Sequence, residues 1–425
     1  MNIFDQLLAD NQIPKFVRVC HEMDHSHIDD IEGAVAQAMR REGTLDRIKP
    51  GDSVCITAGS RDVANIARII RAICDQVKSV GAHPFIIPAM GSHAGAKAEG
   101  QRGIIEGYGV TEEAMGAPIR ASMDTEVIAH SKSGLEIHLD KFANAADFLI
   151  PVGRIKAHTD FRGEVESGIC KMLVIGMGKQ HGAYQCHKLG FKSMAANVKE
   201  FAGAIIEKKP NMFAIGLIEN AYHQTCRIEA IPAGRILAEE PPLLEYAKSR
   251  MAKVPFDQAD ILFVDETGKD ISGAGMDPNV TGRSPVLGIS RPFFQRIAVF
   301  DLTDKSHGNF GGLGSADVTT QRLYRKIDFE QTYPNGITAA EPLAVRLPAV
   351  MPSDRTAMQF ALRTATDCDW EKGPRIVWLK NTLSLSEFYI SEALIPDAEA
   401  LDNVTIVSEP MEVIFDEEGN VKELR

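Results

Sequence analysis

A lysine and three histidines lie within a short stretch of this chain, RIKAHTDFRGEVESGICKMLVIGMGKQHGAYQCHKLGF. They are Lys171, His158, His181 and His187. An imidazole binds metal ions or moves protons near neutral pH. A deprotonated lysine amine is a nucleophile that can carry a covalent adduct. The combination indicates a cofactor anchored beside a metal ion and acid/base groups.

Each of these residues also has a simpler interpretation. Lys171 lies in the otherwise apolar run ICKMLVIG, where burial would lower the pKa of its amine. A helix lysine often extends its ammonium to solvent instead. Arg154 and Lys156 precede His158 and favour its neutral, proton-accepting form, although the three could form a surface basic patch. Gly176 and Gly178 lie between Lys171 and both later histidines, so the chain can turn back and bring an imidazole near the amine.

A second set of candidates lies nearer the N-terminus. His93 follows a strand-like run, among the small residues of MGSHAGAKAEG, and Ser60 and Arg61 follow Gly59 at a predicted strand-to-helix turn. The amides of such a turn favour an anion, and Arg61 would add charge. The alternatives are an N-cap for Ser60, a surface charge for Arg61 and a solvated loop residue for His93.

The composition narrows the class of protein. The chain has 425 residues, 44% hydrophobic and 24% charged, which is typical of globular proteins, and its length allows two or three domains. A formal net charge of −12 disfavours nucleic acids and anionic membrane surfaces as partners. The sequence contains no run of 18 apolar residues and no secretory signal. Its seven scattered cysteines form no CxxC, so we expect a reducing cytoplasm.

Short apolar runs alternate with helical patterns, which predicts an α/β fold of two α/β domains with mainly parallel sheets. The predicted strands are residues 52–58, 84–90, 146–152, 212–220, 259–266, 296–302 and 374–381. The predicted helices are residues 61–81, 96–109, 194–209 and 353–366. The predicted domains are residues 1–255 and 256–400, followed by a tail, 401–425, that packs back on the first domain.

In open parallel sheets, ligands bind beyond the carboxyl ends of the strands. The loops predicted there are residues 58–61, 91–93 and 265–269. We expect them to converge on an active site in the cleft between the two domains. Residues 265–283 and 309–317 are rich in glycine and could supply backbone donors to anions. Neither segment contains GxGxxG after a strand, so a dinucleotide site is not predicted.

Taken in order, these residues resemble the lactate racemase family. The family pattern is a TR-like turn after the first strand, a G-[ST]-H loop, a histidine, a lysine that ends a glycine-containing segment, and a further histidine. The matching residues here are Ser60, Arg61, Gly91, Ser92, His93, His158, Lys171 and His187. Lys171 lies 13 residues after His158 and 16 before His187. The resemblance covers most of the first α/β block and the start of the second.

The resemblance implies a nickel-pincer nucleotide, held covalently through a thioamide at Lys171. It implies that His187 is the nickel ligand, with His181 as the alternative. It also implies that His93 and His158 are the acid/base pair. We therefore expect a racemase or epimerase of a 2-hydroxy acid, loaded by cofactor-synthesis enzymes.

In the same family, anionic groups of the substrate or cofactor are contacted by the turn and by the start of the second domain. The corresponding residues are Ser60 and Arg61 in the turn, with Glu266 and Lys269 in the second domain. The resemblance does not identify the hydroxy acid or the oligomeric state.

The chain departs from the family pattern at two loops. His93 is followed by Ala94 instead of the usual arginine, and the segment between His158 and Lys171 is about three residues longer than usual. Both departures concern loops that face the substrate. The alternatives are a zinc-dependent hydrolase with His93, His158 and His187 as ligands, and a non-catalytic binding protein of the same fold.

Overall fold

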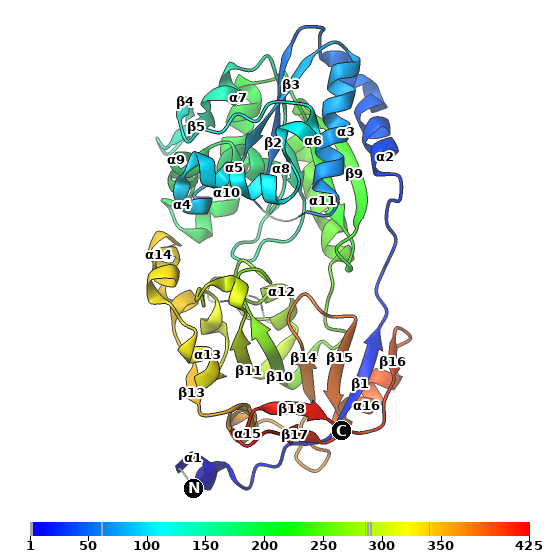
Figure 1. Cartoon of the computed structure of the whole chain (residues 1–425), viewed down its shortest axis with the longest axis vertical. Coiled ribbons are helices and arrows are strands. Elements are labelled where there is room, and N and C mark those ends of the chain that lie inside the picture. Colours follow the sequence, from blue (N-terminus) through cyan, green and yellow to red (C-terminus); the bar gives the residue numbers. More distant parts are fainter. Residues whose placement is uncertain (1–2, 61–62, 285, 287–288, 290, 340) are drawn as a thin grey trace. The chain divides into compact units, whose positions relative to one another are not determined.

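The computed structural model describes residues 3–60, 63–284, 286, 289, 291–339 and 341–425. The chain forms two units, and most of their helices and strands are labelled in Figure 1. One unit comprises Asp24–Met251 and is called the histidine unit, because it carries His93, His158 and His187. The other combines Met1–Met23 with Ala252–Arg425 and is called the split unit.

The histidine unit alternates strands and helices, as the sequence predicts. Its strands are β2 (Ser53–Ala58), β3 (His83–Pro88), β4 (Thr125–His130), β5 (Glu136–Asp140), β6 (Phe148–Ile150), β7 (Val152–Arg154), β8 (Phe213–Glu219) and β9 (Thr225–Pro232). Its helices are α2 (Ile31–Arg40), α3 (Ile66–Ser79), α4 (His93–Ala96), α5 (Ala98–Gly107), α6 (Glu112–Met115), α7 (Lys141–Ala145), α8 (Ile169–Lys171), α9 (Lys179–His187), α10 (Phe191–Lys208) and α11 (Ile236–Arg250).

The central strands of this unit are covered by helices on both faces. Strands β3, β2 and β6 form a parallel sheet, and β7, β8 and β9 a second sheet with one parallel and one antiparallel pair. The Val152 N–H donates to Thr57 Oγ1 at 2.8 Å, which joins β7 to β2. Cys55 packs in one hydrophobic cluster with α10 and α11, and Ile56 in another with α2 and α3. Because both faces are buried, these strands are apolar along their length.

The split unit contains the remaining elements. Its strands are β1 (Phe16–His21), β10 (Gln258–Thr267), β11 (Phe293–Leu302), β12 (Val318–Thr320), β13 (Ala349–Met351), β14 (Ile376–Leu379), β15 (Glu387–Ser391), β16 (Val404–Ile406), β17 (Val413–Phe415) and β18 (Val421–Leu424). Its helices are α1 (Ile3–Leu8), α12 (Pro278–Thr281), α13 (Gln321–Arg325), α14 (Phe329–Ala339), α15 (Asp354–Thr364) and α16 (Ile395–Glu399).

The split unit is built on one sheet with the strand order β13-β12-β11-β10-β14-β15-β1-β16. The first five strands are parallel, and β15, β1 and β16 add antiparallel pairs at one side. The N-terminal strand β1 is therefore enclosed between two C-terminal strands. The β17–β18 hairpin packs on α15, where the Val421 N–H donates to Asp354 Oδ2 at 2.9 Å.

The α/β fold with mainly parallel sheets is as the sequence predicts, and the domain division differs in detail. The chain passes from one unit to the other at Met251 and Ala252, close to the predicted boundary at 255/256. Residues 1–23 and 401–425, which we expected with the first domain, lie in the split unit. Strand pairing across nearly the whole chain joins them there, and the alternation of a single strand does not reveal its partner. No helix of the described residues is long and apolar enough to cross a membrane.

Candidate active site

The segment that carries Lys171 and His187 is an interrupted helix. It begins as α8, continues through a π-helical turn at Met172–Gly176 and resumes as α9. The break falls at Lys179, whose φ of 56° is left-handed. A Cβ on Gly178 would lie 2.1 Å from the Val174 carbonyl oxygen, so only glycine fits there. π-turns inside helices are frequent at functional sites.

His158 lies directly against Lys171. Its Nε2 is 2.5 Å from Lys171 Nζ, and its ring stacks on Phe161 at a centroid distance of 4.2 Å. The Asp160 N–H donates to His158 Nδ1 at 2.9 Å. A neutral ring that accepts at Nδ1 carries its proton on Nε2, and an Nε2–H can bond only to an unprotonated amine. The contact therefore favours the nucleophilic form of the lysine side chain.

The protonation state of His158 is set by burial and charge. Its side chain is 11% exposed. Burial holds its pKa well below the usual range, and the positive charge of Lys171, when that amine is protonated, lowers it further, as do Lys156 and Arg162. The ring is therefore neutral at neutral pH, which is the form of an imidazole that a proton acceptor requires.

His187 lies close enough to this pair for its charge to act on His158. Its Nδ1 bonds to the Ala183 carbonyl oxygen at 2.6 Å, one turn earlier in α9. Burial lowers the pKa of His187, the hydrogen bond to the Ala183 carbonyl offsets part of this shift, and the charge of Lys171, when that amine is protonated, lowers the pKa further. The neutral ring donates from Nδ1 and keeps the lone pair of Nε2, as metal-binding histidines commonly do. His181, by contrast, is exposed and stacks on His138 at 5.5 Å.

His93 and Ser60 form a second group, at the ends of β3 and β2. Ser60 Oγ lies 3.4 Å from His93 Nε2, and Tyr108 Oη donates to the Ser60 carbonyl oxygen at 3.0 Å. His93 is exposed, and Ala94 after it takes a left-handed φ of 53°, which is strained for a residue with a side chain. Arg61 lies outside the described residues.

Close packing of glycines joins the two groups. A Cβ on Gly59 would lie 3.2 Å from the Met172 methyl carbon, next to Lys171. A Cβ on Gly91 would lie 3.2 Å from Ala183 Cβ, and Ala183 is the residue whose carbonyl oxygen bonds His187 Nδ1. The loops after β2 and β3 therefore rest directly on the helix that carries Lys171 and His187. Ser60, His93, His158, Lys171 and His187 thus belong to one region of the histidine unit, at the carboxyl end of its parallel strands.

Glu266 and Lys269 lie in the split unit, at the carboxyl end of β10. Asn381 Nδ2 donates to Glu266 Oε1 at 2.9 Å, and Lys269 Nζ donates to the Gly273 carbonyl oxygen at 2.6 Å. The two glycine-rich segments of the sequence meet here, since a Cβ on Gly311 would lie 2.8 Å from Lys269 Nζ. The Trp378 Nε1–H donates a hydrogen bond to Asp265 Oδ1, next to Glu266, at 2.6 Å. Burial raises the pKa of Asp265 to about 6.

The described residues contain no group of three His, Cys, Asp or Glu side chains arranged to hold a metal ion. His93 contacts Ser60, whereas His158 Nε2 faces Lys171. This placement counts against the zinc alternative, which needs all three histidines as ligands. A metal ion that needs only one imidazole from the protein could bind at His187 Nε2, whose lone pair is kept when Nδ1 donates to the Ala183 carbonyl oxygen.

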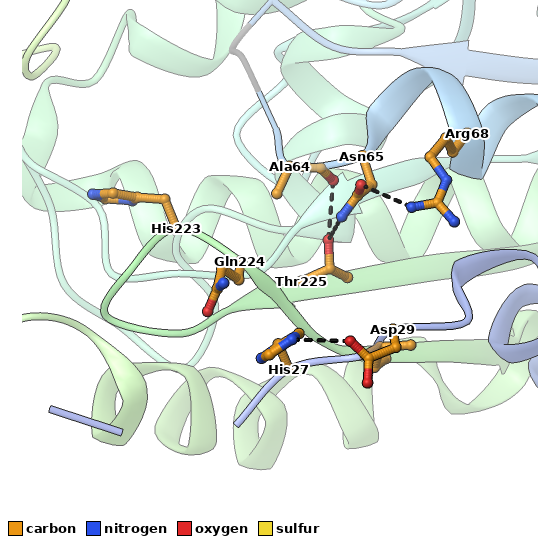
Figure 2. A pocket seen from close by; sticks show the side chains of 9 residues that line it. His27, Asp29, Ala64, Asn65, Arg68, His223, Gln224 and Thr225 are labelled. Atoms are coloured by element: carbon orange, nitrogen blue, oxygen red, sulfur yellow. Dashed lines mark hydrogen bonds and ion pairs between the residues drawn. The ribbon is translucent and has the colours of Figure 1, made fainter. Parts of the chain in front are cut away.

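A pocket of about 290 Å³ lies elsewhere in the histidine unit (Figure 2). It is lined by His27, Ile28, Asp29, Ala64, Asn65, Arg68, His223, Gln224 and Thr225. Its polar side chains are already hydrogen-bonded within the protein. Asn65 Nδ2 donates to Thr225 Oγ1 at 3.1 Å, and the Arg68 guanidinium donates to both carboxylate oxygens of Glu32. None of the predicted site residues that the structure describes lines it, so we assign no chemistry to it.

The sequence did not predict two buried carboxylates that bond the backbone beside His158 and Lys171. Glu166 and Glu240 are fully buried, and Glu166 Oε2 accepts the His158 N–H at 2.7 Å. Glutamates in a loop and on a helix are ordinarily exposed, so nothing local marks them. The one available signal was the position of Glu166 between His158 and Lys171.

Comparison with known proteins supports the fold. No protein-family model matches the chain, and no curated protein matches it in sequence. Among solved structures it is similar to the lactate racemase apoprotein from Thermoanaerobacterium thermosaccharolyticum. The match has a TM-score of 0.52 and 14% identity, and covers 87% of this chain and 99% of that one. At this identity the likeness establishes a shared fold.

Proposed function

We propose that this chain is a racemase or epimerase of a 2-hydroxy acid that works with a nickel-pincer nucleotide bound at Lys171. The observation that carries the proposal is the contact between Lys171 Nζ and His158 Nε2, with His187 beside it. An amine held in its nucleophilic form is suited to covalent attachment, and a free imidazole nitrogen nearby is suited to a soft metal ion. The fold that the chain shares with a lactate racemase apoprotein supports the same proposal.

The chemistry explains why two histidines are needed. The α-hydrogen of a 2-hydroxy acid is a poor acid, because the carboxylate opposes a second negative charge. When bound, the nucleotide supplies a site that accepts this hydrogen as hydride and returns it. The protein removes the hydroxyl proton, and each enantiomer presents its hydroxyl differently. We assign one face to His158 and the other to His93.

The remaining residues bind and orient. Lys269 and Glu266 in the split unit, with Ser60 and Arg61 in the histidine unit, are assigned to the anionic groups of substrate and nucleotide. Both loops follow parallel strands, where ligands of α/β proteins usually bind. The side chain of the hydroxy acid is left open by this assignment.

The test is to produce the protein together with the enzymes that synthesise the cofactor, and to measure its intact mass and bound metal. We expect an adduct of several hundred daltons with nickel, both absent from Lys171→Ala. Lys188→Ala, a change at an exposed lysine on the same segment, is the matched control and should keep the adduct. An adduct that survives Lys171→Ala, or that maps to Lys179, would contradict the assignment. Zinc without an adduct would favour the hydrolase.

A further inference from the structure

The carboxylate of Glu240 binds the helix that carries Lys171. Glu240 lies on α11 and is 0% exposed. Its Oε2 accepts the Cys170 N–H at 2.8 Å, and the Ile169 N–H also contacts the carboxylate. These are the first N–H groups of α8, which have no partner within their own helix. The N-cap residue is Gly168, which has no side chain to satisfy them.

The fit between Glu240 and Gly168 is close. A Cβ at residue 168 would lie 2.0 Å from Glu240 Oε1. Any other residue there would push the carboxylate away, so glycine is required by this contact and not by its backbone angles. A distant glutamate thus replaces the side chain that ordinarily caps a helix.

Glu166 holds the other partner of the reactive contact in the same manner. It is 0% exposed, and its Oε2 accepts the His158 N–H at 2.7 Å. Its Oε1 lies 3.0 Å from Lys248 Nζ. Lys248 belongs to α11, as Glu240 does. Helix α11 therefore contacts both partners of the site. Its Glu240 bonds the backbone next to Lys171, and its Lys248 pairs with Glu166, which bonds the backbone of His158.

Burial of two carboxylates is costly unless their bonds are well formed. Both of these bonds end on backbone beside the two side chains whose 2.5 Å contact defines the site. A change of a few tenths of an ångström in either backbone would alter that contact. We infer that Glu240 and Glu166 are positioning residues, which set the register of Lys171 against His158 from helix α11. This inference rests on the proposed function for the meaning of the Lys171–His158 contact.

The first experiment uses the protein without cofactor. Hydrogen exchange in peptides spanning residues 168–172 should accelerate about tenfold in Glu240→Ala, because the hydrogen bonds that the Glu240 carboxyl group accepts protect these amides. Glu240→Gln keeps an acceptor oxygen and should restore most of the protection. The matched control is Glu239→Ala, which removes the neighbouring glutamate of α11. Glu239 forms an ion pair with Arg235, just before the helix begins. Unchanged exchange in Glu240→Ala would overturn the inference.

The second experiment reads the side chain itself. Acetylation of Lys171 by acetic anhydride at pH 7, followed by peptide mapping, should slow several-fold in Glu240→Ala and Glu166→Ala, because the amine is no longer held against His158 Nε2. Glu164→Ala removes an exposed carboxylate paired with Lys199 and serves as the control. Faster hydrogen exchange in Glu240→Ala with an unchanged acetylation rate of Lys171 would show that Glu240 only caps helix α8. That result would overturn the positioning role. Should an alanine variant fail to fold, Glu240→Asp, which keeps the charge but shortens the reach, should give an intermediate rate.

The third measurement separates this inference from the function. In protein loaded with cofactor, the fraction of Lys171 that carries the adduct should fall in Glu240→Ala and recover in Glu240→Gln, at temperatures where both remain folded. If the wild-type protein takes no adduct, the proposed function fails, and the acetylation rates still decide whether the two glutamates position Lys171.

Discussion

Lys179 offers a test of how the interrupted helix is held. Its side chain is 0% exposed, donates to the Pro88 carbonyl oxygen and lies 3.4 Å from Asp140 Oδ2. Asp140 is also 0% exposed, and its N–H donates to the Met177 carbonyl oxygen. Burial lowers the pKa of Lys179 and raises the pKa of Asp140, so each charge depends on the other. The pair fixes the turn between Lys171 and His187.

Lys179→Met keeps much of the volume and removes the cation. Removing one partner of a buried ion pair costs about 3–5 kcal/mol, because the other charge is left buried. Asp140 can avoid part of this cost by taking up a proton, which raises its folded-state pKa further. A group with a raised folded-state pKa binds more protons in the folded chain than in the unfolded one, so stability falls as pH rises. We therefore expect the variant to lose more stability at pH 8 than at pH 5.

Urea unfolding at both pH values measures this directly. Lys188→Met, at an exposed position, is the control and should change stability by less than about 0.5 kcal/mol. Adding Asp140→Asn to Lys179→Met should recover part of the loss, because no lone charge remains. A cost below about 1 kcal/mol, as for a surface pair, or a loss that grows toward pH 5, would refute the reasoning.

Three further predictions concern the histidines. His187→Ala should lose nickel from loaded protein and His181→Ala should retain it, as metal analysis would measure; the reverse result would assign the metal to His181. His93→Ala and His158→Ala should each slow racemisation in both directions by about 10²–10⁴-fold, and solvent deuterium appearing at the α-carbon would instead indicate a carbanion route. Because burial lowers the pKa of His158 and His187, the unfolded chain takes up protons below about pH 6.5 that the folded chain does not. Stability should therefore fall between pH 7 and pH 5, and His158→Gln should reduce the slope seen in urea unfolding; an unchanged slope would contradict the buried, neutral ring.

Local patterns predicted much of the fold. The apolar runs at 52–58 and 259–266 become β2 and β10, and the periodic segment 194–209 becomes α10. The β4–β5 hairpin and the place of β1 between β15 and β16 were not predicted. Pairing between residues far apart in sequence depends on the tertiary fold. Strand β4 is largely exposed and has too little apolar alternation to stand out, and its buried partner β5 is only five residues long.

The candidate site was predicted as residue types and spacing, and the structure adds what holds them. The 13-residue spacing brings His158 to Lys171 only because the chain between them folds back, with the Lys156 N–H bonded to the Ser167 carbonyl oxygen at 3.0 Å. The glycines at 59 and 91 read as turn residues in the sequence. Their role as contact points for the helix beneath them depends on tertiary packing, which spacing does not encode.

The longer segment between His158 and Lys171 is the clearest departure from the family pattern. This segment supplies Asp160, whose N–H bonds His158 Nδ1, and Glu166, which bonds the His158 N–H. The added length therefore goes with contacts that hold His158, to which the proposed function gives an acid/base role, and under that proposal it need not alter the substrate. No contact in the structure explains Ala94 in the same way. It follows His93 in a strained, exposed turn, at a position where the lactate racemase pattern usually has an arginine. If the proposed function holds, a difference in substrate should be sought on the His93 side, where a carboxylate or sugar hydroxyl would meet a smaller, uncharged residue.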